Sequence, residues 1–232
     1  METGHSVPVL ERTPQIWSAS ASISSVDLSH PYEVLLPRIE GRIAAVVAAT
    51  TRPLSGRELA RLAASPRSGT WRTLTRLVDH GIVLRQEAGG GTLLYTLNRD
   101  HVAAEAVLLL SDLQGRLFER MRASLLTWNP RPVHVSVFGS AARRDGNTAS
   151  DVDLFVVRPS GIAEGHKQWR SQIDSLANDV VGWSGNHLGV VDFSLAATRR
   201  LGRERPPIVA ELERDAITLL GQPVREILSM IR

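Results

Sequence analysis

Two aspartates and a glycine–serine pair, all between residues 133 and 157, have the types and spacing that chemistry on a phosphate would need. Asp151 and Asp153 lie two residues apart, and an apolar run begins at Leu154. Residues two apart in a strand share one face of the sheet, so both carboxylates point the same way. Such a pair can hold Mg²⁺, which prefers one or two carboxylates together with substrate phosphates and water. The spacing therefore predicts a magnesium site for a phosphorylated substrate.

The glycine–serine pair predicts a matching anion site. Valines alternate with other residues from Val133 to Phe138, which is typical of a strand. Gly139 and Ser140 break this strand, and a short helix can open directly after them. Free backbone N–H groups at a helix start, with the Ser140 hydroxyl beside them, can bind phosphate. The alternative interpretation is a turn and two surface aspartates on an edge strand.

Together these residues form a pattern that resembles a known superfamily. Gly139-Ser140-x-x-Arg143 followed by Ser150-Asp151-x-Asp153-Leu154 resembles the signature of the DNA polymerase β-like nucleotidyltransferases, and the minimal nucleotidyltransferases in particular. This resemblance implies transfer of a nucleoside monophosphate to a protein, a tRNA end or a small molecule. It also implies two Mg²⁺ ions and a nucleoside triphosphate substrate, with ATP as the expected nucleotide.

The resemblance also implies roles for individual residues. Asp151 and Asp153 would be metal ligands, and Gly139 and Ser140 would hold the β- and γ-phosphates. Arg143 would either bind phosphate or support the loop. The next residue is a departure, because Arg144 stands where the family often has glycine. This departure bears on the shape of the phosphate loop.

A third carboxylate is expected at Asp192. This aspartate interrupts the apolar run of a strand predicted over residues 188–195. A buried carboxylate is costly unless it is paired or bound to metal. By the resemblance, Asp192 would complete a catalytic and metal-binding set with Asp151 and Asp153. The alternatives are an edge-strand aspartate facing water and two rival acids, Asp174 and Asp179, which lie on a predicted helix.

The N-terminal part of the chain predicts three helices and a β-hairpin. Helical spacing runs over residues 37–49, and Ser55 with Glu58 forms a capping box for a second helix that buries Leu59, Leu62 and Ala63. Ser68 can cap a third helix, which ends before Gly81. We expect that helix to bury Trp71, Leu74, Leu77 and Val78.

The hairpin follows over residues 82–97, with a glycine-rich loop at 87–91. The pattern resembles the winged-helix domains of bacterial transcription regulators, and Gly81 and the exit Tyr95-Thr96-Leu97-Asn98 carry the resemblance. It implies binding to double-stranded DNA. Residues 37–99 hold ten arginines against four acids, a net charge of +6 that favours phosphate contacts.

The second helix of a helix-turn-helix pair enters the major groove. The candidate DNA-binding residues are therefore on the third helix and its start: Arg67, Ser68, Thr70, Arg72, Thr75 and Arg76. The alternative is a winged helix used only for dimerisation or protein contacts.

The predicted fold class is α+β. Residues 1–30 are expected to be a disordered leader, 31–100 a winged helix-turn-helix, 101–129 a long linker helix, and 130–232 a nucleotidyltransferase domain with a small mixed sheet. The leucine-rich helix over 102–128 could also pair with a second copy, so a homodimer stays open. A further helix is expected over 163–181 and a helix-turn-strand over 208–221.

Composition narrows the class of protein further. The apolar and charged fractions of 43% and 22% are ordinary for a globular protein. No run approaches 18 apolar residues, so no membrane contact is expected, and the absence of cysteine agrees with a cytoplasmic location. The seven histidines lack zinc-site spacing.

The favoured interpretation is a DNA-binding nucleotidyltransferase. The alternatives are a transcriptional regulator that only senses nucleotide and a toxin–antitoxin component that represses its own operon.

Overall fold

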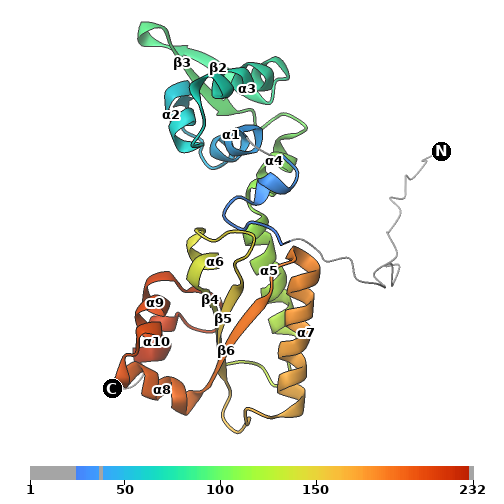
Figure 1. Cartoon of the computed structure of the whole chain (residues 1–232), viewed down its shortest axis with the longest axis vertical. Coiled ribbons are helices and arrows are strands. Elements are labelled where there is room, and N and C mark those ends of the chain that lie inside the picture. Colours follow the sequence, from blue (N-terminus) through green and yellow to red (C-terminus); the bar gives the residue numbers. More distant parts are fainter. Residues whose placement is uncertain (1–24, 37–38, 230–232) are drawn as a thin grey trace, which may run out of the picture.

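The chain builds two helix-and-strand bodies, which helices α4 and α5 connect (Figure 1). The computed structural model describes residues 25–36 and 39–229. The expectations for residues 1–24 and 37–38 therefore lie outside the described residues. The N-terminal body consists of η1 (Pro31–Val34), α1 (Ile39–Ala48), β1 (Leu54–Ser55), α2 (Gly56–Leu62), α3 (Arg67–Asp79), β2 (Val83–Ala88), η2 (Gly89–Gly91) and β3 (Thr92–Leu97).

Local signals explain where the N-terminal elements begin and end. The Ser55 hydroxyl accepts a hydrogen bond from the Glu58 backbone N–H, and the Glu58 carboxylate accepts one from the Ser55 backbone, so the predicted capping box is confirmed. Helix α3 is capped at Pro66, not at Ser68, so that expectation is wrong. Strands β2 and β3 pair antiparallel as the predicted hairpin, and β1 pairs with the outer side of β3.

The core of this body differs from the predicted one at two residues. Leu59 and Leu74 are fully buried as expected, but Leu62 is 47% exposed and Trp71 is 64% exposed. Helix α3 buries Gly69, Thr70, Thr73 and Leu74. Gly69 lies directly against the Ile39 side chain, where a β-carbon would clash. Because a helix turns by about 100° per residue, this orientation directs Trp71 away from the core.

The linker is two helices and not one, so the prediction of a single helix over 102–128 is wrong. Helix α4 (Ala104–Ser111) ends at Asp112, whose φ of −126° and ψ of 35° are not helical, and α5 (Leu113–Leu126) begins directly after it. The Asp112 carboxylate folds over Gly115, into the space that a β-carbon there would fill. Aspartate and glycine are both poor helix formers, which agrees with a break at this point.

The C-terminal body is built on a mixed four-stranded sheet in the order β6-β5-β4-β7. Strand β5 runs antiparallel to β4 and parallel to β6, and β4 also pairs antiparallel with β7. The α+β class is thus confirmed. The elements are β4 (His134–Phe138), α6 (Gly139–Arg143), β5 (Val152–Arg158), α7 (Lys167–Ser184), β6 (Leu188–Ser194), α8 (Leu195–Glu204), α9 (Pro207–Asp215), β7 (Ile217–Leu220) and α10 (Val224–Ser229).

Helices cover both faces of this sheet (Figure 1). Helices α5 and α7 pack on one face against the even-numbered residues of β5, Val152, Leu154 and Val156. Helices α9 and α10 pack on the other face against the odd-numbered Phe155 and Val157. Alternate residues of β5 therefore belong to two separate hydrophobic clusters, as the two-residue period of a strand requires.

Residues 25–30 belong to the C-terminal body. The Val26 N–H donates to the Ser184 carbonyl at 2.9 Å, and the Asn186 side-chain amide donates to the Val26 carbonyl at 3.1 Å. Leu28 is buried in the cluster formed by α5 and α7. The prediction that the leader extends to residue 30 is therefore wrong for this segment.

In the described part of the chain, every helix is too short or too polar to cross a bilayer.

Candidate active site

Asp153 lies between two glycines, one at the start of α6 and one on the neighbouring strand β6. In the sheet register its partners are Phe138 at the end of β4 and Gly189 in β6. A β-carbon on Gly139, which follows Phe138, would be 2.9 Å from Oδ2 of Asp153, and one on Gly189 would be 2.8 Å from Oδ1. Gly139 also has a φ of +70°, which favours glycine. Glycine at both positions therefore leaves room for this carboxylate in its present orientation.

The two motif aspartates interact electrostatically. Asp151 is exposed and directly precedes β5, whereas Asp153 is half-buried. Burial raises the pKa of Asp153, and the negative charges of Asp151 and Glu211 raise it further. A cation bound beside Asp153 would relieve this repulsion.

The two carboxylates at this end of β5 fit Mg²⁺ only if the substrate supplies further ligands. The described residues include no cluster of three or more histidine, cysteine or acidic side chains with metal-binding geometry. Magnesium commonly takes one or two carboxylates and completes its shell with phosphate oxygens and water. Asp151 and Asp153 therefore suit a magnesium ion that arrives with a triphosphate.

The predicted short helix is α6, but it begins at Gly139 itself and not after Ser140. The loop behind it is held by side chains, because the Ser150 hydroxyl accepts from the Asn147 N–H and the Asn186 amide donates to the Ser150 carbonyl. These bonds hold Ser150, and with it the start of β5, beside Asn186, which lies between α7 and β6.

Arg143 is engaged by carboxylates of the protein itself. Its guanidinium contacts Asp145 at 2.8 Å and Asp215, at the end of α9, at 2.7 Å. Arg214 also contacts Asp215 at 2.7 Å, and these two arginines hold the pKa of Asp215 at about 2. Of the two expected roles for Arg143, this geometry favours support of the loop, since the side chain fastens α6 to α9.

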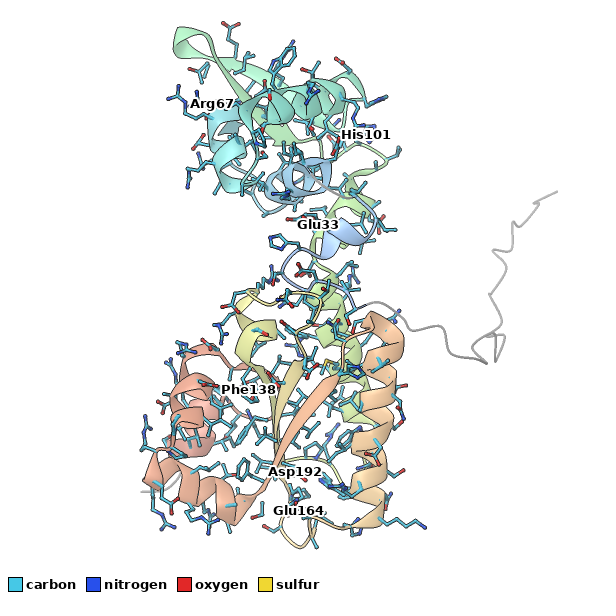
Figure 2. The ribbon with its side chains drawn as sticks, in the orientation of Figure 1. Glu33, Arg67, His101, Phe138, Glu164 and Asp192 are labelled. Carbon is cyan, nitrogen blue, oxygen red and sulfur yellow. The ribbon has the colours of Figure 1, made fainter. Side chains whose placement is uncertain are left out.

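Asp192 does not join the other aspartates. It pairs in register with Val156, while Asp153 pairs with Gly189, three residues earlier in β6. Paired residues share a face, and Val156 faces α5 and α7, so Asp192 points to the face opposite Asp153. Figure 2 labels Asp192 and Phe138, and the two lie at different heights along the sheet. The expectation of a three-carboxylate site with Asp192 is wrong.

Asp192 has a different set of partners. Its Oδ2 is 2.7 Å from Nη1 of Arg158 and accepts a hydrogen bond from the Trp169 indole at 2.9 Å. The Asp192 and Arg158 side chains are only 12% and 8% exposed. The apolar run around Asp192 is thus interrupted by a buried ion pair.

The candidate DNA-binding residues are not equally accessible. Arg67, Ser68, Arg72, Thr75 and Arg76 are exposed on α3, although Arg76 also pairs with Glu40 at 3.5 Å. Thr70 is only 2% exposed, and its hydroxyl donates to the Pro66 carbonyl at 3.0 Å. The expectation that Thr70 contacts DNA is therefore wrong, because its side chain is used inside the domain.

Sequence reasoning did not connect Gly189 or Glu211 with Asp153, and it assigned Trp71 to a buried face. Gly189 carries a usable signal, since glycine inside a strand often marks a close approach of another group. The exposure of Trp71 and the proximity of Glu211 to Asp153 depend on packing and leave no such signal.

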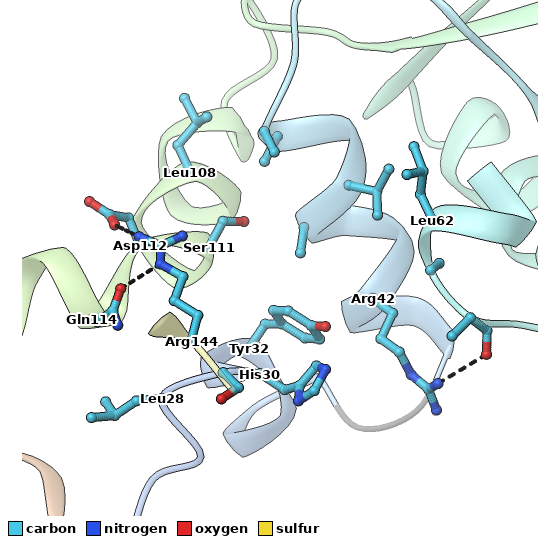
Figure 3. A pocket seen from close by; sticks show the side chains of 17 residues that line it. Leu28, His30, Tyr32, Arg42, Leu62, Leu108, Ser111, Asp112, Gln114 and Arg144 are labelled. Carbon is cyan, nitrogen blue, oxygen red and sulfur yellow. Dashed lines mark hydrogen bonds and ion pairs between the residues drawn. The ribbon is translucent and has the colours of Figure 1, made fainter. Parts of the chain in front are cut away.

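A separate cavity of about 570 Å³ lies at the junction of the two bodies (Figure 3). Arg42 and Leu62 border it from the N-terminal body, and Arg144 borders it from the C-terminal body. Arg144 donates to the Gln114 side chain and lies 3.5 Å from Asp112, so it fastens the end of α6 to the α4–α5 break.

Comparison with known proteins adds little to this geometry. No family model matches the sequence, and no curated protein matches it. The chain is similar to a solved structure described as a crystal structure of a toxin-antitoxin with AMP-PNP, with 18% identity and a TM-score of 0.30. The similarity covers 48% of this chain and 85% of that one. At this TM-score the backbones differ too much for the likeness to support a fold or a function.

Proposed function

We propose that the chain is a nucleotidyltransferase with a DNA-binding winged helix. It would transfer a nucleoside monophosphate from a magnesium nucleoside triphosphate, with ATP as the expected nucleotide, to an acceptor hydroxyl. The observation that carries the proposal is the packing of the Asp153 carboxylate against Gly139: its Oδ2 lies 2.9 Å from the place that a β-carbon on Gly139 would occupy. This contact puts the Asp153 carboxylate directly beside the Gly139-Ser140 turn that would bind phosphate.

Each residue of the site has a defined task in this reaction. The backbone N–H groups of Gly139 and Ser140 would donate to the β- and γ-phosphates. Asp151 and Asp153 would hold magnesium, which supplies positive charge for an in-line displacement at the α-phosphate. Arg143 would keep α6 in position through its ion pair with Asp215. Asp192 has no part in the site.

The topology of the N-terminal body supports a winged helix. Its order is helix, strand, two helices and a hairpin, and the short β1 completes a three-stranded sheet with the hairpin. Helix α3 exposes a basic face with Arg67, Arg72 and Arg76. That face would contact the major groove of duplex DNA.

The transferase activity is tested by incubating the protein with labelled ATP, Mg²⁺ and cell extract. The wild-type protein should label an acceptor, and Asp151→Asn or Asp153→Asn should remove the labelling without loss of the folded state. Asp179→Asn is the matched control, because Asp179 is exposed on α7, away from the site. Labelling by both motif variants at the wild-type rate would remove the proposed site.

A second candidate is a regulator that binds nucleotide without transferring it. The location of Asp192 on the other face favours this alternative, since it leaves Asp151 and Asp153 without the expected third catalytic carboxylate. In that case Mg-ATP should change the affinity for DNA while no acceptor is labelled. Measurement of DNA binding with ATP and with a non-hydrolysable analogue separates the two functions.

A further inference from the structure

Trp71 is a large apolar side chain on the exposed face of α3. It is 64% exposed, and Ser68, Arg72 and Thr75, which lie within one turn of it, are also exposed. The buried face of the same helix is formed by Gly69, Thr70, Thr73 and Leu74. Trp71 therefore contributes little to the core.

The charge around Trp71 indicates what kind of partner covers it. Arg72 follows it directly, and Arg67 lies one turn before it on the same helix. An indole among arginines suits a polyanion that also presents flat or apolar groups, and duplex DNA is such a partner. Arginines contact phosphates, whereas apolar side chains contact the 5-methyl group of thymine in the major groove.

We propose that Trp71 contacts base edges in the major groove and makes the protein prefer thymine at the position it touches. This inference rests on the proposed DNA-binding function. Arg67 and Arg72 hold the helix on the phosphates, and the Trp71 ring supplies contact that depends on sequence. Trp71 is thus a specificity-determining residue.

The two kinds of contact differ in their dependence on salt. A phosphate contact releases counterions, so its loss changes the slope of log K against log salt by about 0.9. An indole carries no charge and releases none. Trp71→Ala should therefore weaken binding without changing the salt slope. Arg72→Ala should make the slope less steep by about 0.9, the value for one phosphate contact.

The test starts from duplexes that the full-length protein selects from a random library. Trp71→Ala should lower affinity for the selected duplex about tenfold and affinity for a random duplex much less. Replacing one thymine in the selected duplex with deoxyuridine, which lacks the methyl group, should weaken wild-type binding and leave Trp71→Ala unaffected. Leu126→Ala is the matched control, because Leu126 is 56% exposed at the end of α5, which packs on the C-terminal sheet and not in the body that holds α3.

The outcomes separate this inference from the function on which it rests. If the wild-type protein binds no duplex at low salt, the winged helix does not bind DNA, and both the proposed DNA-binding function and the role of Trp71 are wrong. If it binds DNA and Trp71→Ala keeps the same affinity and thymine dependence, only the role of Trp71 is wrong. If the variant instead changes the sedimentation of the free protein, the face contacts a second copy, and the inference is overturned. Trp71→Gln and thermal unfolding of both variants exclude a folding defect as the cause.

Discussion

Removal of the Asp192 carboxylate should destabilise the protein without impairing the chemistry of the site. Asp192→Ala leaves the Arg158 guanidinium, which is only 8% exposed, without its partner at 2.7 Å. It also removes the acceptor for the indole of Trp169, a residue that is completely buried. An uncompensated buried charge of this kind costs about 3–5 kcal/mol.

The expected shift in melting temperature follows from the size of the C-terminal body, which contains the ion pair. Each kcal/mol lowers the Tm of a domain of about 100–150 residues by about 4 °C, so Asp192→Ala should melt roughly 12–20 °C below the wild type. Asp192→Asn should lose less, because its amide oxygen can still accept from Trp169. The double variant Arg158→Met with Asp192→Leu should regain much of the loss, since apolar residues can replace a buried ion pair with little cost.

Thermal and urea unfolding of these variants, beside transfer measured at low temperature, checks the reasoning. Transfer per folded molecule should stay near the wild-type rate in Asp192→Ala. A variant that melts at the wild-type temperature but has lost transfer would refute the structural role of Asp192 and return it to the catalytic site.

Three further predictions concern the site and the sheet beneath it. Mg²⁺ with a non-hydrolysable triphosphate should raise the Tm of the wild type, because a ligand that binds only the folded state stabilises it. The same addition should not raise the Tm of Asp151→Asn or Asp153→Asn. Equal shifts in all three proteins would contradict the metal site. Gly189→Ala places a β-carbon 2.8 Å from Oδ1 of Asp153 and should weaken this Mg-triphosphate response with little change in the Tm without ligand, whereas Gly182→Ala, where nothing lies within 4 Å, should keep the response. His134 is buried and its pKa is lowered from 6.5 to about 4, so its contribution to stability is complete above pH 6.5 and is lost as the pH falls towards 4. Unfolding free energy should therefore fall by about 1.4 kcal/mol more per pH unit across this window in the wild type than in His134→Gln, and parallel pH profiles would contradict this.

Short-range patterns in the sequence determined the elements of the site. The alternation over residues 133–138, the glycine–serine break and the spacing of Asp151 and Asp153 predict strand, turn and strand, and β4, α6 and β5 appear there. The Ser55–Glu58 capping box is likewise local and was predictable. These features depend on neighbours within a few residues, which a sequence displays directly.

Tertiary structure decided which residues come together. The register between β5 and β6 directs Asp192 away from Asp153, and a shift of one residue would have reversed this, because side chains alternate between faces. The sequence indicated an interrupted apolar run at Asp192 but not its partner Arg158, 34 residues away. The packing of Gly69 on Ile39 fixes the rotation of α3, and with it the exposure of Trp71. Periodicity alone assigned Trp71 to the core. An aromatic residue at helical spacing produces the same sequence pattern whether its side chain packs in a core or contacts a partner.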